Sequence, residues 1–144
     1  MSDANKQLVR EFLTAFYSGD IAAALKTCDD GVEFIVNAPV EFFPHFGPRR
    51  GKTEVAETWR ALHTRYASMR YEVPFLIADD NRAAAIIKIF FRKSSTERVV
   101  QTSVADFYTF RGDRIASIQQ FFDTFDAIEQ TLERDITGML KQRT

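Results

Sequence analysis

The fold is decided by one stretch near the C-terminus, Ala105-Asp106-Phe107-Tyr108-Thr109-Phe110-Arg111-Gly112-Asp113-Arg114-Ile115-Ala116-Ser117-Ile118-Gln119-Gln120-Phe121-Phe122. Aromatic and β-branched residues dominate both halves of this stretch, and such residues favour β-strands. The Gly-Asp pair between the halves is typical of a short hairpin turn. The stretch therefore predicts a β-hairpin whose strands cover 98–110 and 115–122.

One carboxylate, that of Asp106, interrupts the apolar hairpin. An ionised carboxylate among such neighbours is costly unless it is paired, hydrogen-bonded or protonated, and functional sites often contain groups of this kind. Because alternate side chains of a strand share a face, we expect Val104, Asp106, Tyr108 and Phe110 on one side. Asp106 is therefore the candidate catalytic residue. The alternative is a carboxylate at a sheet rim, hydrogen-bonded to a strand neighbour or paired with an arginine.

Hydrophobic spacing before and after the hairpin predicts the remaining elements. Helices are expected over 5–17, from 21 to a stop at 29–31, from Lys52 or Thr53 to 68, and from 124 to 138. Further strands are expected over 32–36, 71–77 and 83–93. Asp20, Thr53 and Asp123 precede helical segments, where their side chains can act as N-caps. Helices segregated from an antiparallel meander predict an α+β fold, in one domain over 1–144.

Composition excludes several functional classes. The 19 basic and 20 acidic residues give no net attraction to nucleic acid or to an anionic membrane. No apolar run approaches the ~18 residues that a membrane span needs, and the N-terminus lacks signal-peptide features. A single cysteine, Cys28, cannot form an intrachain disulfide, which favours a reducing, cytoplasmic location. The 14 phenylalanines indicate an aromatic interior, a lined cavity, or both.

The segment 37–52 is an unusual loop because it carries four aromatic side chains, Phe42, Phe43, His45 and Phe46. Exposed loops seldom hold so much apolar area, which would remain in contact with water. Two interpretations remain open. The loop either folds over a cavity or packs against a partner chain.

Four motifs carry a resemblance to a known family. They are Phe16-Tyr17-Ser18-Gly19-Asp20, Asp29-Asp30-Gly31-Val32, Phe46-Gly47-Pro48-Arg49-Arg50-Gly51-Lys52, and the run from Asp106 to Ile115 that leads to Phe121-Phe122-Asp123. In this order they resemble the nuclear-transport-factor-2-like fold, and within it the SnoaL-like and ketosteroid-isomerase-related proteins. The resemblance implies a cone-shaped α+β domain, whose curved antiparallel sheet wraps around helices and encloses an apolar central cavity.

The resemblance also implies a role for Asp106. This residue matches the protonated aspartate that, in ketosteroid isomerase, donates a hydrogen bond to the substrate oxyanion. Three positions depart from the family pattern. Phe12 stands at the match for a second donor, a tyrosine, and Asn37 at the match for a general base. Gln120 stands where epoxide hydrolases of this fold have an acidic residue.

The remaining site residues follow from the same match. Tyr108, His63 or His45 would supply a second donor, while Asn37 and Gln120 would orient the substrate. The aromatic wall that excludes water would consist of Phe12, Phe16, Trp59, Tyr66 and Phe122, and ordinary core packing is the alternative for each. The two histidines lie far apart, with no carboxylate at a metal-ligand spacing, so neither a metal nor a cofactor is expected.

We therefore expect a cofactor-free isomerase or cyclase-like enzyme that acts on a small hydrophobic carbonyl compound by acid/base chemistry. Related proteins are often homodimers, and the resemblance implies a homodimer through the outer face of the sheet. Two alternatives come from other classes: a non-catalytic protein that binds a small apolar ligand, and an oligomerisation module with a vestigial pocket. Members of this fold differ in their reactions, so the fold leaves the activity open.

Overall fold

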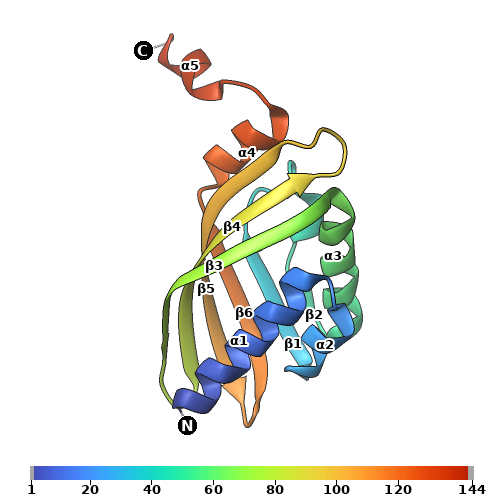
Figure 1. The fold of residues 1–144 in the computed structure, drawn as a ribbon, viewed down its shortest axis with the longest axis vertical. Coiled ribbons are helices and arrows are strands. Elements are labelled where there is room, and N and C mark those ends of the chain that lie inside the picture. Colours follow the sequence, from blue (N-terminus) through green and yellow to red (C-terminus); the bar gives the residue numbers. More distant parts are fainter. Residues whose placement is uncertain (1, 143–144) are drawn as a thin grey trace.

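A curved sheet wraps around two helices in the computed structural model, which describes residues 2–142 (Figure 1). The elements in chain order are α1 (Ser2–Ser18), α2 (Ile21–Lys26), β1 (Cys28–Asn37), the short 3₁₀ helix η1 (Pro44–Phe46), β2 (Arg49–Arg50), α3 (Lys52–Arg65), β3 (Tyr66–Ala78), β4 (Arg82–Lys93), β5 (Val99–Arg111), β6 (Arg114–Phe122), α4 (Thr124–Leu132) and α5 (Ile136–Lys141). The fold is α+β, as the sequence predicts. Helices α1 and α3 lie on the concave face of the sheet.

The six strands follow the order β2-β1-β6-β5-β4-β3. The last four form the predicted antiparallel meander, and the hairpin of β5 and β6 turns at Gly112, whose φ is +61°. The sheet is mixed rather than wholly antiparallel, because β1 runs parallel to β6. These two strands are far apart in the chain, so no hairpin turn fixes their relative direction. The sheet therefore remains open, with β2 and β3 at its edges.

Several predicted boundaries differ from the structure. Helix α2 ends at Lys26, and the segment 29–31 belongs to β1 because Cys28 already pairs with Ile115 of β6. Helix α3 begins at Lys52, which is one of the two predicted starts, and its N-cap is Gly51, whose φ of +84° suits a glycine, rather than Thr53. It ends at Arg65, since the next residues pair with β4. In each case strand pairing or backbone geometry outweighs local propensity.

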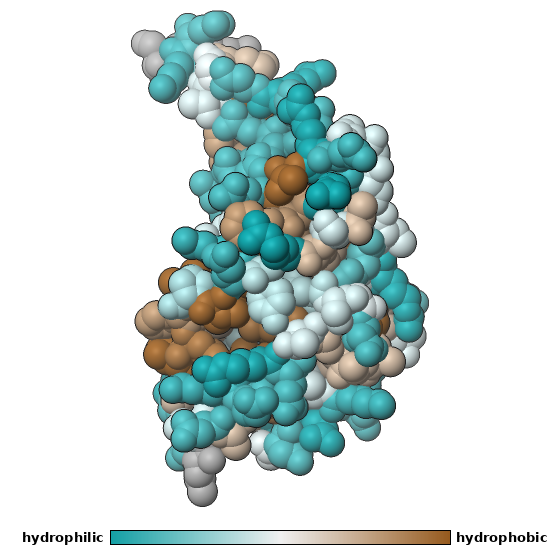
Figure 2. All heavy atoms as spheres, in the orientation of Figure 1, coloured by the Kyte–Doolittle hydropathy of each residue, from teal (hydrophilic) through white to brown (hydrophobic). Residues whose placement is uncertain are grey.

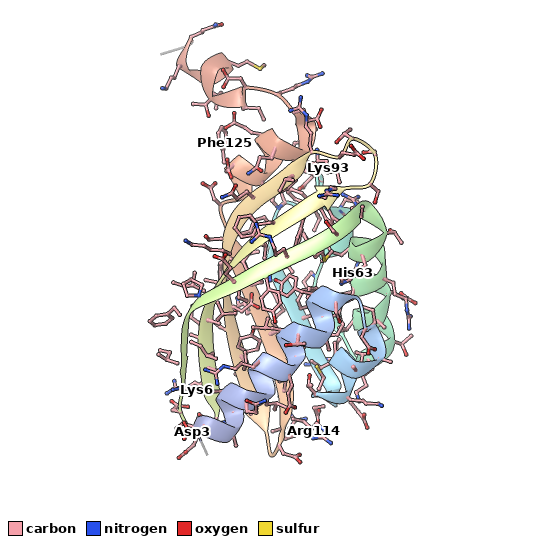
Figure 3. The ribbon with its side chains drawn as sticks, viewed as in Figure 1. Asp3, Lys6, His63, Lys93, Arg114 and Phe125 are labelled. Carbon is pink, nitrogen blue, oxygen red and sulfur yellow. The ribbon has the colours of Figure 1, made fainter. Side chains whose placement is uncertain are left out.

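The predicted C-terminal helix is divided in two. Glu133 adopts a left-handed conformation, with φ +56°, and ends α4. Asp123 is the expected N-cap of α4: its carboxylate accepts a hydrogen bond from the backbone N–H of Asp126 at 3.0 Å. At the other end of α4, the Nζ of Lys93 donates to the carbonyls of Gln130 and Thr131 at 3.0 and 3.2 Å (Figure 3). These contacts hold α4 across one end of the sheet.

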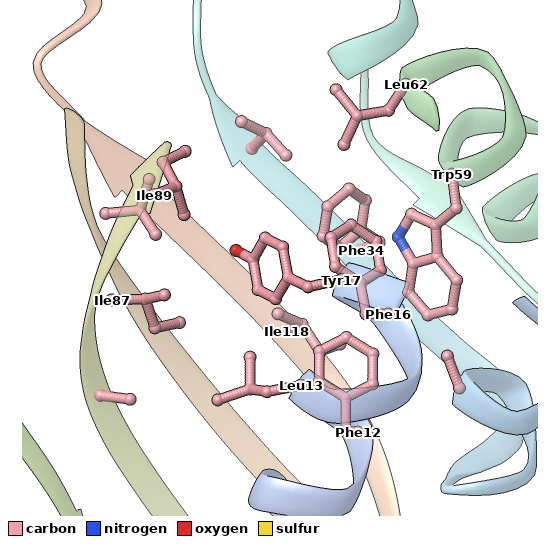
Figure 4. Close-up of a cluster of buried hydrophobic side chains, with 14 of the residues drawn as sticks. Phe12, Leu13, Phe16, Tyr17, Phe34, Trp59, Leu62, Ile87, Ile89 and Ile118 are labelled. Atoms are coloured by element: carbon pink, nitrogen blue, oxygen red, sulfur yellow. The ribbon is translucent and has the colours of Figure 1, made fainter. Parts of the chain in front are cut away.

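The core lies between the concave face of the sheet and the helices α1 and α3. Figure 4 shows its aromatic part, where Phe12 and Phe16 of α1 approach Trp59 of α3 with ring centroids 5.5 and 5.4 Å apart. Both phenylalanines are buried, and Trp59 is fully buried. Among residues 2–142, no helix is both long and apolar enough to cross a membrane.

Candidate functional site

Asp106 is the central residue of the candidate site, and it is buried on the concave face of β5 with 2% of its surface exposed. The hydroxyl of Tyr108, two residues along the same face, donates a hydrogen bond to Asp106 Oδ2 at 2.7 Å. Gln120 lies opposite Asp106 on β6, and its Nε2 donates to Oδ1 at 2.9 Å. Each carboxylate oxygen therefore has one protein donor. Tyr108 shares a face with Asp106, as the alternation along β5 predicts.

Two opposing effects determine the ionisation of Asp106. Burial raises the pKa of the carboxyl to about 6, because removal from water penalises the charged form. The hydrogen bonds from Tyr108 and Gln120 act in the opposite direction, since they stabilise the carboxylate. A carboxyl with a pKa near 6 is mostly ionised at neutral pH and gains a proton under mildly acidic conditions. It is therefore suited to exchange protons near physiological pH.

An apolar cavity lies beside this carboxylate and extends toward α4. Its volume is about 60 Å³, which is room for a few water molecules. Most lining residues are aromatic or aliphatic, and the polar ones are Tyr17, Tyr66, Thr102, Gln120 and Thr131. Asp106 itself stands behind the lining. Its two inner-face neighbours Val104 and Gln120 form the adjacent cavity wall.

The predicted aromatic wall divides into two groups. Phe16 and Phe122 line the cavity, as does Gln120. Phe12, Trp59 and Tyr108 instead pack together behind it: Phe12 lies 6.2 Å from Tyr108, measured between ring centroids. The indole N–H of Trp59 has no hydrogen-bond partner within residues 2–142, and its ring meets Phe34 edge-on at 5.8 Å. The position of Phe12 thus holds a packing residue.

Two further predicted residues lie away from the carboxylate. Asn37 is exposed at the end of β1, where its Oδ1 accepts a hydrogen bond from Gln119 at 3.4 Å. His63 of α3 (labelled in Figure 3) packs against Phe16, with ring centroids 5.3 Å apart, and its burial lowers its pKa. The Nε2 of His63 has no hydrogen-bond partner among residues 2–142. The side chain of His45 lies outside the described residues.

The aromatic loop contributes two cavity residues, Phe43 and Phe46, which both lie near Phe122. These two residues of the loop fold over the cavity, whereas Phe42 remains exposed.

Tyr17 also lines the cavity, although the sequence did not single it out as a site residue. Its helical spacing was the available signal, because Tyr17 follows the apolar residue Leu13 by four residues, about one turn of a helix. No group of three or more metal-ligating side chains occurs in the part of the chain that the structure describes.

Solved structures with the same fold define the class of protein. An isomerase candidate from Rhodopseudomonas palustris is 25% identical, with a TM-score of 0.79, over 91% of this chain and 97% of the other. An NTF2-like protein of unknown function from Burkholderia pseudomallei is 23% identical, with a TM-score of 0.80, over 90% and 97%. A candidate SnoaL-like polyketide cyclase from Jannaschia is 9% identical, with a TM-score of 0.77, over 89% and 91%. The fold is therefore nuclear-transport-factor-2-like.

The family follows from the sequence itself. The family model described as the SnoaL-like domain matches residues 9–118, which is more than half of the chain. The protein belongs to the SnoaL-like domain family, which the four motifs predict. A search of curated proteins found no significant match.

Proposed function

We propose that this protein is a cofactor-free isomerase or cyclase-like enzyme that moves protons on a small hydrophobic carbonyl compound. One observation carries the proposal: a buried carboxylate, held by Tyr108 and Gln120 with a pKa of about 6, stands beside an apolar cavity. The SnoaL-like family and the isomerase and cyclase candidates among its structural neighbours are consistent with this class of chemistry.

In the proposed mechanism, Asp106 acts as a proton shuttle. A bound β,γ-unsaturated ketone displaces the amide of Gln120, the residue that both contacts Asp106 and lines the cavity. The carboxylate then accepts a proton from the carbon next to the carbonyl, and the electron pair of that C–H bond moves into an enolate. The protonated Asp106 returns the proton to a different carbon, which shifts the double bond and regenerates the carboxylate. No oxidant or reductant is consumed.

The cavity limits the size of the substrate. Its small volume of about 60 Å³ and its apolar lining favour a small compound over a polycyclic one. The described lining residues include no cation, so a neutral compound fits better than a carboxylate or a phosphate. The free thiol of Cys28 is buried, which is consistent with the proposed cytoplasmic location.

The first test uses phenol and its methyl ether, anisole, which differ in one hydrogen-bond donor. Phenol can donate to ionised Asp106, so we expect its affinity to rise severalfold between pH 5 and pH 8, as the carboxyl loses its proton. Anisole should show no such dependence. Isothermal titration at each pH measures both ligands against the wild type and Asp106→Asn.

The variant should bind phenol with an affinity that does not change with pH. Binding of phenol that is indifferent both to pH and to the substitution would contradict acid/base chemistry at Asp106. It would instead favour a non-catalytic ligand-binding protein. Absence of binding by every small aromatic compound tested would favour a vestigial pocket.

We also propose a homodimer through the outer face of the sheet. Large apolar side chains are exposed on this face of β3 to β6, namely Phe75, Ile77, Ile86, Phe107 and Phe121. The strand register places them in two adjacent rows across the sheet, and the rings of Phe107 and Phe121 touch edge-on at 5.8 Å. Apolar atoms also gather at the left edge of Figure 2, beside these strands. A patch of this kind is typical of a protein–protein interface.

Phe107→Glu should dissociate this dimer, because the substitution puts a charge at the centre of the apolar rows. Analytical ultracentrifugation at micromolar concentration should give a dimer for the wild type and a monomer for the variant. The control is Lys88→Glu, which changes a charge on the same face of the sheet, next to the apolar patch. A monomeric wild type, or a variant that remains dimeric, is incompatible with this interface.

A further inference from the structure

Tyr17 is a buried polar side chain of the cavity with an unused hydroxyl group. It lines the cavity, and only 6% of its surface is exposed. Within residues 2–142, the structure gives its hydroxyl no hydrogen-bond partner. The oxygen is not among the fully enclosed polar atoms of the described residues that lack a partner, so it reaches space that water or a ligand can occupy. It is therefore available to bond to a molecule in the cavity.

The ring of Tyr17 is held firmly by other aromatic side chains. It stacks on Tyr71, with centroids 4.7 Å apart and an interplanar angle of 23°, and it meets Phe16 edge-on at 4.9 Å. Figure 4 shows the consequence: the hydroxyl of Tyr17 points away from Phe16 and Trp59, into the space on the side of Ile89. Phe16 and Ile89 also line the cavity. A fixed donor is thus aimed at the space that a ligand would occupy.

Burial keeps the hydroxyl of Tyr17 protonated. It raises the pKa of Tyr17 well above its ordinary value, and the negative charge of Asp106 raises that pKa further. The hydroxyl therefore acts as a donor. When Asp106 accepts a proton from a ketone, the single negative charge leaves the carboxylate and appears on the ketone oxygen. A donor that faces the cavity stabilises the charge after its transfer.

We propose that Tyr17 donates a hydrogen bond to the carbonyl oxygen of the substrate and stabilises the enolate that forms there. This inference rests on the proposed function and assigns the second donor, which the sequence lacks at Phe12. It also narrows the ligand class, because the ligand must present an acceptor oxygen to α1 and an acidic C–H to β5. A ligand with an oxygen acceptor should consequently bind better than a hydrocarbon of the same shape.

The test uses acetophenone and α-methylstyrene, which have nearly the same shape but differ in C=O against C=CH₂. The wild type should bind acetophenone about tenfold more tightly than α-methylstyrene. Tyr17→Phe removes only the oxygen, so it should abolish this preference and leave the affinity for α-methylstyrene unchanged. The matched control is Tyr71→Phe, which removes the hydroxyl that contacts Thr14 Oγ1 at 3.2 Å. This variant should retain the preference for acetophenone. Isothermal titration measures both ligands against all three proteins.

Catalysis gives a second readout. Tyr17→Phe should lower kcat for the isomerisation of cyclohex-3-en-1-one by about 10²–10³-fold, as expected when one donor to an oxyanion is lost. A variant that keeps the preference for the ketone overturns the role of Tyr17, as does a wild type without any such preference. Neither result affects the proposed role of Asp106, because the pH-dependent binding of phenol is measured separately. Loss of that phenol dependence would overturn the proposed function itself.

Discussion

Asp106→Asn is expected to slow the conversion of cyclohex-3-en-1-one into cyclohex-2-en-1-one by about 10²–10⁴-fold, the usual contribution of a positioned acid/base group. Asparagine has the shape of aspartate but cannot accept a proton from carbon. The increase in ultraviolet absorbance of the conjugated product measures the rate. In the wild type, kcat/KM should rise as the pH passes upward through about 6, because the carboxylate is the active form of the base.

The matched control is Asp113→Asn, the same substitution at a carboxylate in the turn between β5 and β6. The side chain of Asp113 is 90% exposed and pairs only with the neighbouring Arg114 among the described ion pairs. This variant should retain the full rate. Near-ultraviolet circular dichroism establishes that both variants keep the wild-type packing. Full activity in a correctly folded Asp106→Asn protein would contradict the role of Asp106 as the base.

The sequence was sufficient to predict which residues of β5 share a face. Alternation places Asp106 and Tyr108 on the same side of the strand, and the structure has a hydrogen bond between them. The partner on β6 could not be predicted in this way. Continued from the turn without interruption, the strand register would set Gln119 opposite Asp106, but an irregularity in the β5–β6 pairing sets Gln120 there instead.

The extent of the cavity could not be predicted in the same way. Phe12 and Phe16 lie on the same stripe of α1, yet only Phe16 reaches the cavity, because Phe12 packs between Trp59 and Tyr108. Which of the two residues reaches the cavity depends on the position of α1 along the sheet. Helical spacing gives no information about this tertiary packing. Asn37 illustrates the same limit. A family match put it near the site, but the pairing of β1 with β6 leaves it exposed.

The orientation of Tyr17 could be predicted only in part. Its spacing from Leu13 indicates the buried side of α1, but the direction of its hydroxyl depends on Tyr71, which comes from β3. A tyrosine on the apolar side of a helix can pack in the core or take part in a binding site. Only the absence of a protein hydrogen-bond partner for its oxygen distinguishes these two cases. Sequence patterns indicate which side chains are buried. Whether a buried polar atom has a hydrogen-bond partner can be determined only from the three-dimensional structure.

The stability of the wild type relative to Asp106→Asn is expected to fall by about 3 kcal/mol between pH 3.5 and pH 7.5. The pKa of Asp106 is about 6 in the folded protein and 3.8 as the ordinary value. Below pH 3.8 the carboxyl is neutral in both the folded and the unfolded chain, so its ionisation does not change the free energy of unfolding. Between the two values only the unfolded chain releases the proton, so rising pH favours unfolding. Above pH 6 the carboxyl is ionised in both states, and the loss of stability remains constant.

Urea unfolding of both proteins at several pH values measures this difference. Asparagine does not titrate, so subtraction of the two free energies of unfolding removes the contributions of every other carboxylate. Tyr108→Phe provides a second check: loss of its hydrogen bond removes a group that stabilises ionised Asp106. The pH interval in which stability falls should then extend above pH 6. If the curves for wild type and Asp106→Asn are parallel, the carboxyl titrates as it does in water, and burial beside the cavity does not prepare it for proton transfer near neutral pH.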